Sequence, residues 1–201
     1  PRDPAQAVAV VRRAVELGVD FIDTADSYGP FVSEDLIREA LHPYGHVRIA
    51  TKAGLRSGPG PNDTGATRHH LIASCEASLR RLGTDYIDLF LLHGFDGRTP
   101  VEETLSALET LVRAGKVRAI GASNFSAARF KEALDISKKN GLPRYQTMQP
   151  HYNLLERGIE ADMLPLCAAE GVGVIPYYSL ASGFLSGKYR SDADLGKSPR
   201  G

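Results

Sequence analysis

The chain has 201 residues, and its 42% hydrophobic content is enough for a sizeable core in a single domain. It carries 24 basic and 24 acidic side chains, so its zero formal charge gives no reason to expect nucleic acid or an acidic membrane surface as a partner. No apolar run reaches the ~20 residues of a membrane span, and the N-terminal residues lack a signal-peptide pattern.

Two cysteines, Cys75 and Cys167, lie far apart and in no metal-ligand spacing. We therefore expect both to be reduced and packed as small apolar groups, in a cytoplasmic protein without a metal site. His69 and His70 also lack ligand partners at metal spacing.

Helical patterns alternate with short apolar runs along the chain. Asp3 followed by Pro4 is typical of a helix start, and Gly18 of a helix end. The predicted helices cover residues 4–17, 33–41, 67–82, 100–115, 126–140 and 158–170, with another beginning at Gly183. The predicted strands cover residues 20–23, 47–53, 86–92, 117–122, 145–149 and 172–176.

Six strands separated by helix-length crossovers predict a parallel sheet covered by helices. Two architectures fit this alternation: an open doubly wound sheet and a (β/α) barrel. The glycines of the loop at residues 54–65 lack the G-x-G-x-x-G spacing of a dinucleotide-binding open sheet. That absence does not exclude an open sheet of the flavodoxin type.

Polar residues end each predicted strand. In chain order they are Asp23, Lys52, His93, Ser123 with Asn124, Gln149 and Tyr177. In a parallel barrel all of these side chains would gather at the carboxyl ends of the strands, where the active sites of such barrels are built. Each could have a structural role when taken singly, but together they favour a catalytic site.

The types of these residues suggest proton transfer. Asp23 and Lys52 end neighbouring strands, and each buried charge would require the other. Tyr28 follows in the next loop, and we expect the Lys52 ammonium to favour its phenolate and lower its pKa. His93 could then donate a hydrogen bond that orients a carbonyl oxygen.

Other strand ends suit a cofactor. Ser123, Asn124 and Gln149 offer donors and acceptors for an amide such as nicotinamide, and Tyr177 offers a flat face for a ring. A proton donor beside an aromatic, amide-bearing cofactor predicts carbonyl reduction.

Several stretches of the chain resemble the aldo-keto reductase superfamily, with its aryl-alcohol-dehydrogenase-like branch the nearest. The resemblance extends from Phe21 to Tyr189. The stretches that carry it are Phe-Ile-Asp-Thr-Ala-Asp-Ser-Tyr-Gly (21–29), Ile-Ala-Thr-Lys (49–52), Leu-Leu-His-Gly-Phe-Asp (91–96), Gly-Ala-Ser-Asn-Phe (121–125) and Tyr-Tyr-Ser-Leu-Ala-Ser-Gly-Phe-Leu-Ser-Gly-Lys-Tyr (177–189).

This resemblance implies a reversible NADP(H)-dependent reduction of aldehydes or ketones to alcohols, without a metal. Tyr28 would be the general acid, Lys52 with its partner Asp23 would tune it, and His93 would orient the carbonyl. The remaining implied contacts divide into two sets. Ser123, Asn124, Gln149, Tyr177, Leu180, Ser182 and Gly183 would bind the cofactor, and Phe31, Phe95 and Phe125 would line the substrate pocket.

The resemblance also implies an eight-stranded (β/α)8 TIM barrel. We expect residues 1–201 to form one barrel domain that covers about six of the βα units and lacks the first strand and the C-terminal unit. His151 stands where an acidic residue is common in this superfamily. Two alternatives remain open: a non-catalytic, cofactor-binding regulatory subunit of the same fold, and a fragment without activity.

Overall fold

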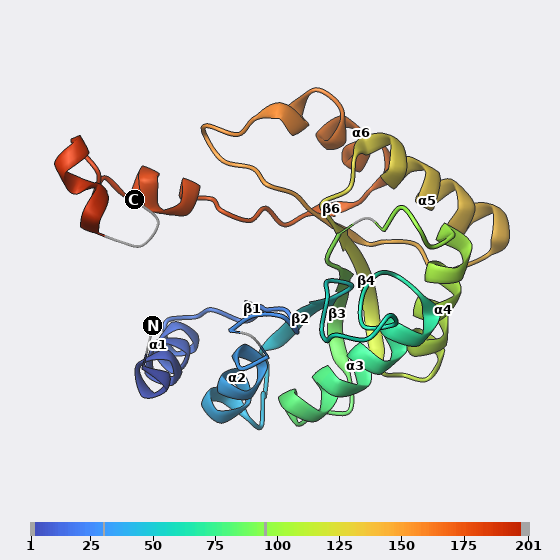
Figure 1. The fold of residues 1–201 in the computed structure, drawn as a ribbon, viewed down its shortest axis with the longest axis horizontal. Helices are drawn as coiled ribbons and strands as arrows, with labels where there is room; N and C mark the ends of the chain where they lie inside the picture. The colour runs from blue at the N-terminus through green and yellow to red at the C-terminus, as the bar shows by residue number, and fades with distance from the viewer. Residues whose placement is uncertain (1–2, 30, 95, 198–201) are drawn as a thin grey trace.

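Six parallel strands form one curled sheet in the computed structural model, which describes residues 3–29, 31–94 and 96–197. The spatial order of the strands follows the chain, and each neighbouring pair is parallel. The strands are β1 (Phe21–Asp23), β2 (Arg48–Ala53), β3 (Ile87–Leu92), β4 (Val117–Ser123), β5 (Thr147–Gln149) and β6 (Gly173–Val174). The expected architecture is confirmed as a curled half-barrel, a partial (β/α)8 barrel (Figure 1).

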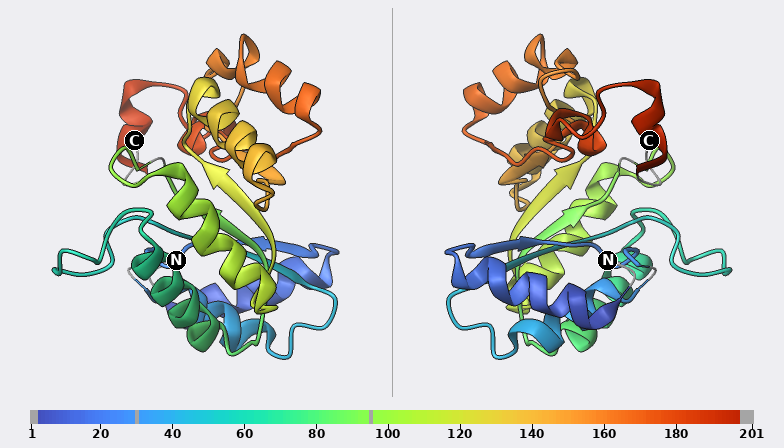
Figure 2. Two further views of the ribbon diagram at one scale, coloured as in Figure 1. Left: turned by 90° about the vertical axis from the view of Figure 1, so that its right-hand side faces the viewer. Right: turned by 90° about the vertical axis from the view of Figure 1, so that its left-hand side faces the viewer.

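Helices follow the strands around the outer side of this sheet (Figures 1 and 2). They are α1 (Pro4–Glu16), α2 (Ser33–Leu41), α3 (Arg68–Leu82), α4 (Val101–Arg113), α5 (Ala127–Asn140) and α6 (Met163–Glu170). Thr67 and Ser126 cap α3 and α5, each accepting a hydrogen bond from a first-turn N–H group. The same two helices end at Gly83 and Gly141, whose left-handed backbone is favourable for glycine.

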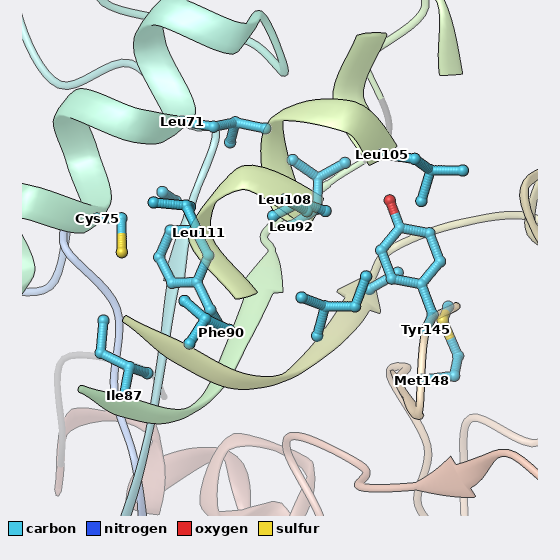
Figure 3. Packing of buried hydrophobic residues seen from close by; sticks show 14 of the residues in the cluster. Leu71, Cys75, Ile87, Phe90, Leu92, Leu105, Leu108, Leu111, Tyr145 and Met148 are labelled. Carbon is cyan, nitrogen blue, oxygen red and sulfur yellow. The ribbon is translucent and has the colours of Figure 1, made fainter. Parts of the chain in front are cut away.

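The main core lies between the sheet and these helices. Phe90 and Leu92 point outward from β3 and pack with Leu105 and Leu108 of α4 (Figure 3). Ile120 of β4 belongs to the same buried cluster. Because side chains alternate along a strand, the residues between them point to the barrel interior. A second, smaller cluster there contains Ala50, Leu89 and Leu91. Toward the carboxyl ends of the strands, the side chains that point into the barrel interior are polar.

Two predicted elements differ from the structure near the C-terminus. The helix expected at residues 158–170 divides into a short 3₁₀ turn, Gly158–Glu160, and α6. The division occurs at Asp162, whose carboxylate caps α6 by accepting from the Met163 N–H group. The helix expected from Gly183 is part of a 3₁₀ segment, Ala181–Ser186, which contains left-handed backbone at Ser182 and Gly183.

The last two predicted strands lose the most residues: the run at 145–149 gives β5 at 147–149, and the run at 172–176 gives β6 at 173–174. Tyr145 precedes β5, and its ring is fully buried and stacked on Phe130 at a centroid distance of 5.9 Å. The apolar pattern at this position therefore reflects core packing.

Among the described residues, no helix is long and apolar enough to cross a membrane.

Gly121 allows close contact between three strands in the barrel interior. It pairs with Leu91 of β3 and Thr147 of β5 in the parallel register. A Cβ atom at this position would overlap Thr147 Oγ1 and lie 3.1 Å from Leu91 Cγ. The strand spacing thus requires glycine here for steric reasons.

We therefore expect Gly121→Ala to lower the free energy of unfolding by about 1–3 kcal/mol, the usual cost of overpacking. Urea unfolding followed by circular dichroism measures the change. Gly158→Ala is the matched control, because a Cβ atom at Gly158 would meet no atom within 4 Å. Equal stability of the two variants would contradict this interpretation of the strand spacing.

Candidate active site

The carboxyl ends of the strands bring the predicted polar residues to one rim of the half-barrel. Asp23 ends β1, and Lys52 lies beside it on β2. His93 directly follows β3, and its backbone N–H donates to Ala53 O at 2.8 Å. Ser123 and Gln149 are register partners at the ends of β4 and β5. The parallel topology therefore places these side chains where sequence reasoning expected them.

Lys52 is held in a buried position by two acceptors. Its side chain is 1% exposed, and Nζ donates to Asp23 Oδ2 at 2.8 Å and to Thr24 O at 2.6 Å. Burial lowers the pKa of Lys52, while the charge of Asp23 opposes that shift. The ion pair thus compensates a cation that would be costly to bury alone.

Tyr28 lies over this pair, at the mouth of the half-barrel. Lys52 Nζ is 5.1 Å from the centre of the Tyr28 ring, and the His93 ring meets it edge to face at 5.7 Å. Burial, followed by the charge of Asp23, raises the pKa of Tyr28. The expected lowering of this pKa by Lys52 is therefore wrong for this arrangement. Nζ donates to Asp23 and Thr24, and the phenol keeps its proton at neutral pH.

His93 is an uncharged imidazole at neutral pH. Burial, reinforced by the nearby charge of Lys52, lowers the pKa of His93 to about 4. Within the described parts of the chain, its buried Nδ1 atom has no hydrogen-bond partner. An N–H group buried without an acceptor is costly, so the tautomer that carries the proton on Nε2 is favoured.

A hydrogen-bond network joins the next three strand ends. Asn124 Nδ2 donates to His93 O at 2.8 Å and to Ser123 Oγ at 3.1 Å. Ser123 Oγ donates to Gln149 O at 2.7 Å, and the Tyr177 hydroxyl donates to Asn124 Oδ1 at 2.7 Å. The four residues predicted to hold a nicotinamide are therefore linked to one another and to His93.

Leu180, Ser182 and Gly183 lie in the turn that follows Tyr177. Gly183 N donates to Leu180 O at 2.9 Å, and the Leu180 side chain is exposed. Ser182 has a positive φ of 57°, which is uncommon for a residue with a side chain. These residues follow the rim closely in sequence. Within the described parts of the chain, no hydrogen bond or ion pair joins them to the catalytic candidates.

The three predicted pocket phenylalanines have different outcomes. Phe125 is 9% exposed and packs edge to face on Phe130 and Tyr145 in the core, so the structure gives no support to its predicted place in the substrate pocket. Phe31 contacts Arg81, with 5.7 Å between the guanidinium carbon and the ring centre, and lines a cavity of about 320 Å³. Phe95 lies outside the described residues.

Sequence reasoning missed a buried polar cluster behind the Tyr28 loop. Glu34 is fully buried, accepting from Thr51 Oγ1 at 2.6 Å and from Arg81 Nε at 2.6 Å. Asp26, two residues before Tyr28, is 2% exposed. Burial and the charge of Glu34 raise the pKa of Asp26 to about 6. The sequence gives little signal of this burial, because Asp26 lies in a loop with Thr24 and Ser27, and Glu34 lies in the first turn of α2, where acidic residues are common.

Comparison with known proteins identifies the family. Residues 1–200 match the model of the Aldo/keto reductase family, and the chain belongs to this family. An L-glyceraldehyde 3-phosphate reductase from Escherichia coli is 38% identical over 189 residues, covering 90% of this chain and 54% of the relative. Aldo-keto reductase YhdN from Bacillus subtilis is also 38% identical over 189 residues, covering 92% and 55%.

A third relative is named for a different role. A probable voltage-gated potassium channel subunit beta from Arabidopsis thaliana is 35% identical over 196 residues, covering 95% of this chain and 60% of the relative. The chain thus spans between about half and three fifths of the length of these curated relatives.

Asp26 provides a test of the buried cluster. Its pKa in the folded state, about 6, lies above the ordinary 3.8, so its contribution to stability is present below pH 3.8 and lost as the pH rises through 6. Asp26→Asn cannot ionise. We expect it to be more stable than the wild type at pH 7.5 by about 2–3 kcal/mol, with the difference vanishing near pH 4.

Urea unfolding at the two pH values measures this difference. The exposed Asp35, on the surface of α2, gives the matched control Asp35→Asn. A stability difference between wild type and Asp26→Asn that is the same at both pH values would contradict the raised pKa.

Proposed function

We propose that the protein reduces aldehydes or ketones to alcohols, reversibly, with NADP(H) as the hydride donor and acceptor. The observation that carries this proposal is the convergence of Tyr28, Lys52, Asp23 and His93 at one rim of the half-barrel. Membership of the aldo/keto reductase family and the reductase-named relatives support it.

Two proton-bearing groups adjoin one another at the mouth. The Tyr28 hydroxyl retains its proton because its pKa is raised, and the favoured His93 tautomer carries a proton on Nε2. A carbonyl oxygen between them would accept hydrogen bonds from both groups. His93 then orients the oxygen, and Tyr28 transfers its proton to that oxygen as the carbonyl carbon is reduced.

Lys52 and Asp23 affect the Tyr28 phenolate that this proton transfer leaves. When Tyr28 gives up its proton, a phenolate forms with its ring centre 5.1 Å from the Lys52 ammonium. A cation at this distance stabilises the new negative charge, particularly where burial excludes water. Asp23 keeps the ammonium fixed and compensates its charge in the resting enzyme. In alcohol oxidation the same phenolate is the base.

The polar rim fits a nicotinamide cofactor in its chemistry. NADPH would supply the hydride. Ser123, Asn124 and Gln149 carry hydroxyl and amide groups that would suit a carboxamide, and hydrogen bonds join Ser123 to Gln149 O and the Tyr177 hydroxyl to Asn124. We assign Leu180, Ser182 and Gly183 to the part of the site that would hold the pyrophosphate of the cofactor.

Cys75 and Cys167 are both free and buried, which supports a cytoplasmic setting.

Replacing the proposed acid gives the sharpest test. We expect Tyr28→Phe to lower kcat for reduction of an aromatic aldehyde by a factor of about 10²–10⁴, because the phenol proton is lost while the ring remains. NADPH absorbance in the steady state measures the rate. The matched control is Tyr86→Phe, since Tyr86 packs against Arg118 away from the rim. Unchanged turnover in Tyr28→Phe would show that the assigned acid is wrong.

The potassium-channel-subunit relative makes a regulatory role the second candidate. A regulatory subunit would bind NADPH and a partner protein with negligible turnover. Single-turnover oxidation of bound NADPH by aldehyde separates the two functions. Oxidation that requires Tyr28 supports the enzyme, and stable bound NADPH supports the regulatory subunit.

A further inference from the structure

His151 forms a stacked pair with Tyr177 at the rim. The two ring centres are 5.1 Å apart, and the ring planes differ by only 9°. The backbone explains this contact, because His151 and Tyr177 form a parallel bridge that extends the pairing of β5 with β6. His151 also continues the inward alternation of Thr147 and Gln149, so its side chain follows Gln149 along the barrel interior.

Asn153 fixes the orientation of the His151 ring. Its Oδ1 accepts from the N–H groups of Leu155 at 2.9 Å and Glu156 at 3.0 Å, which identifies the other side-chain atom as the donor Nδ2. Nδ2 donates to Tyr178 O at 3.1 Å and lies 3.3 Å from His151 Nε2. His151 Nε2 is therefore the acceptor of this contact, and the ring cannot rotate without losing it.

Only one face of the Tyr177 ring is covered by this pair. Tyr178 lies edge-on, with its centre 5.1 Å from that of Tyr177 and 5.5 Å from that of His151. If Tyr178 covered the face of Tyr177 that points away from His151, its ring centre would be much farther from His151 than the observed 5.5 Å. Tyr178 therefore lies beside the stack. The stack and the hydroxyl bond to Asn124 together determine the plane of Tyr177.

We propose that His151 is a positioning residue for the cofactor: it covers one face of Tyr177 and thereby presents the opposite face to the nicotinamide ring. This inference rests on the proposed use of NADP(H). Asn153 holds the His151 ring through its hydrogen bond to Nε2, and Tyr178 packs edge-on against both rings.

Two probes distinguish this role from a general structural one. NADPH contains the nicotinamide ring, whereas 2′-phospho-ADP-ribose lacks it and retains the rest of the recognition groups. We expect His151→Ala to raise the Kd for NADPH about tenfold, in line with the energy of an aromatic contact. The Kd for 2′-phospho-ADP-ribose should stay unchanged, since this probe does not reach Tyr177.

Three further variants complete the experiment, with fluorescence or calorimetric titration of the full chain. His151→Phe keeps a flat ring and should bind NADPH within about twofold of the wild type, because it preserves the stack. His151→Leu fills the same space without a flat ring and should resemble His151→Ala. Leu154→Ala, at an exposed position of the same loop, is the control and should change neither Kd.

The outcomes separate this inference from the function on which it rests. Wild-type binding of NADPH with an unchanged Kd in His151→Ala and His151→Leu overturns the positioning role alone. Equal weakening of both probes also overturns it, since that result indicates a general structural effect. Absence of saturable NADPH binding by the wild type contradicts the proposed function and this inference with it.

Discussion

The buried Lys52 ammonium is the constraint on which the rim of this half-barrel depends. A cation that is 1% exposed requires compensation, and Asp23 Oδ2 with Thr24 O provides it. This requirement ties the end of β1 to β2 and fixes the start of the loop that carries Tyr28. It also places a positive charge next to His93, where that charge adds to burial in keeping the imidazole neutral. Burial and the charge of Asp23 raise the pKa of Tyr28, whereas burial and the charge of Lys52 lower that of His93, so both partners of the ion pair influence the groups at the rim.

The parallel topology explains why residues so distant in sequence meet here. Each strand contributes inward side chains in register, and its last inward residue reaches the same rim. Below the rim the interior is apolar, with Ala50, Leu89 and Leu91, and the outward side chains anchor the helices. The parallel register of the strands therefore fixes the relative positions of the rim residues.

Much of this arrangement could be predicted from the sequence, because it depends on local patterns. The alternation of strands and helices gave the sheet, and the polar residue that ends each strand indicated the rim. Packing across elements could not be predicted in this way. Phe125 follows the Ser-Asn pair as a pocket residue would, yet it contacts Phe130 and Tyr145 in the core. Burial and the charge of Asp23 raise the pKa of Tyr28, and both depend on the three-dimensional geometry of the rim.

Isotope transfer tests most directly the proposal that this rim passes a hydride from NADPH to a carbonyl carbon. The protein is incubated with an aromatic aldehyde and NADPH deuterated at the transferable C4 position, and the alcohol is examined by mass spectrometry. We expect one deuterium on the carbinol carbon. Alcohol without deuterium, or no alcohol at all, would contradict it.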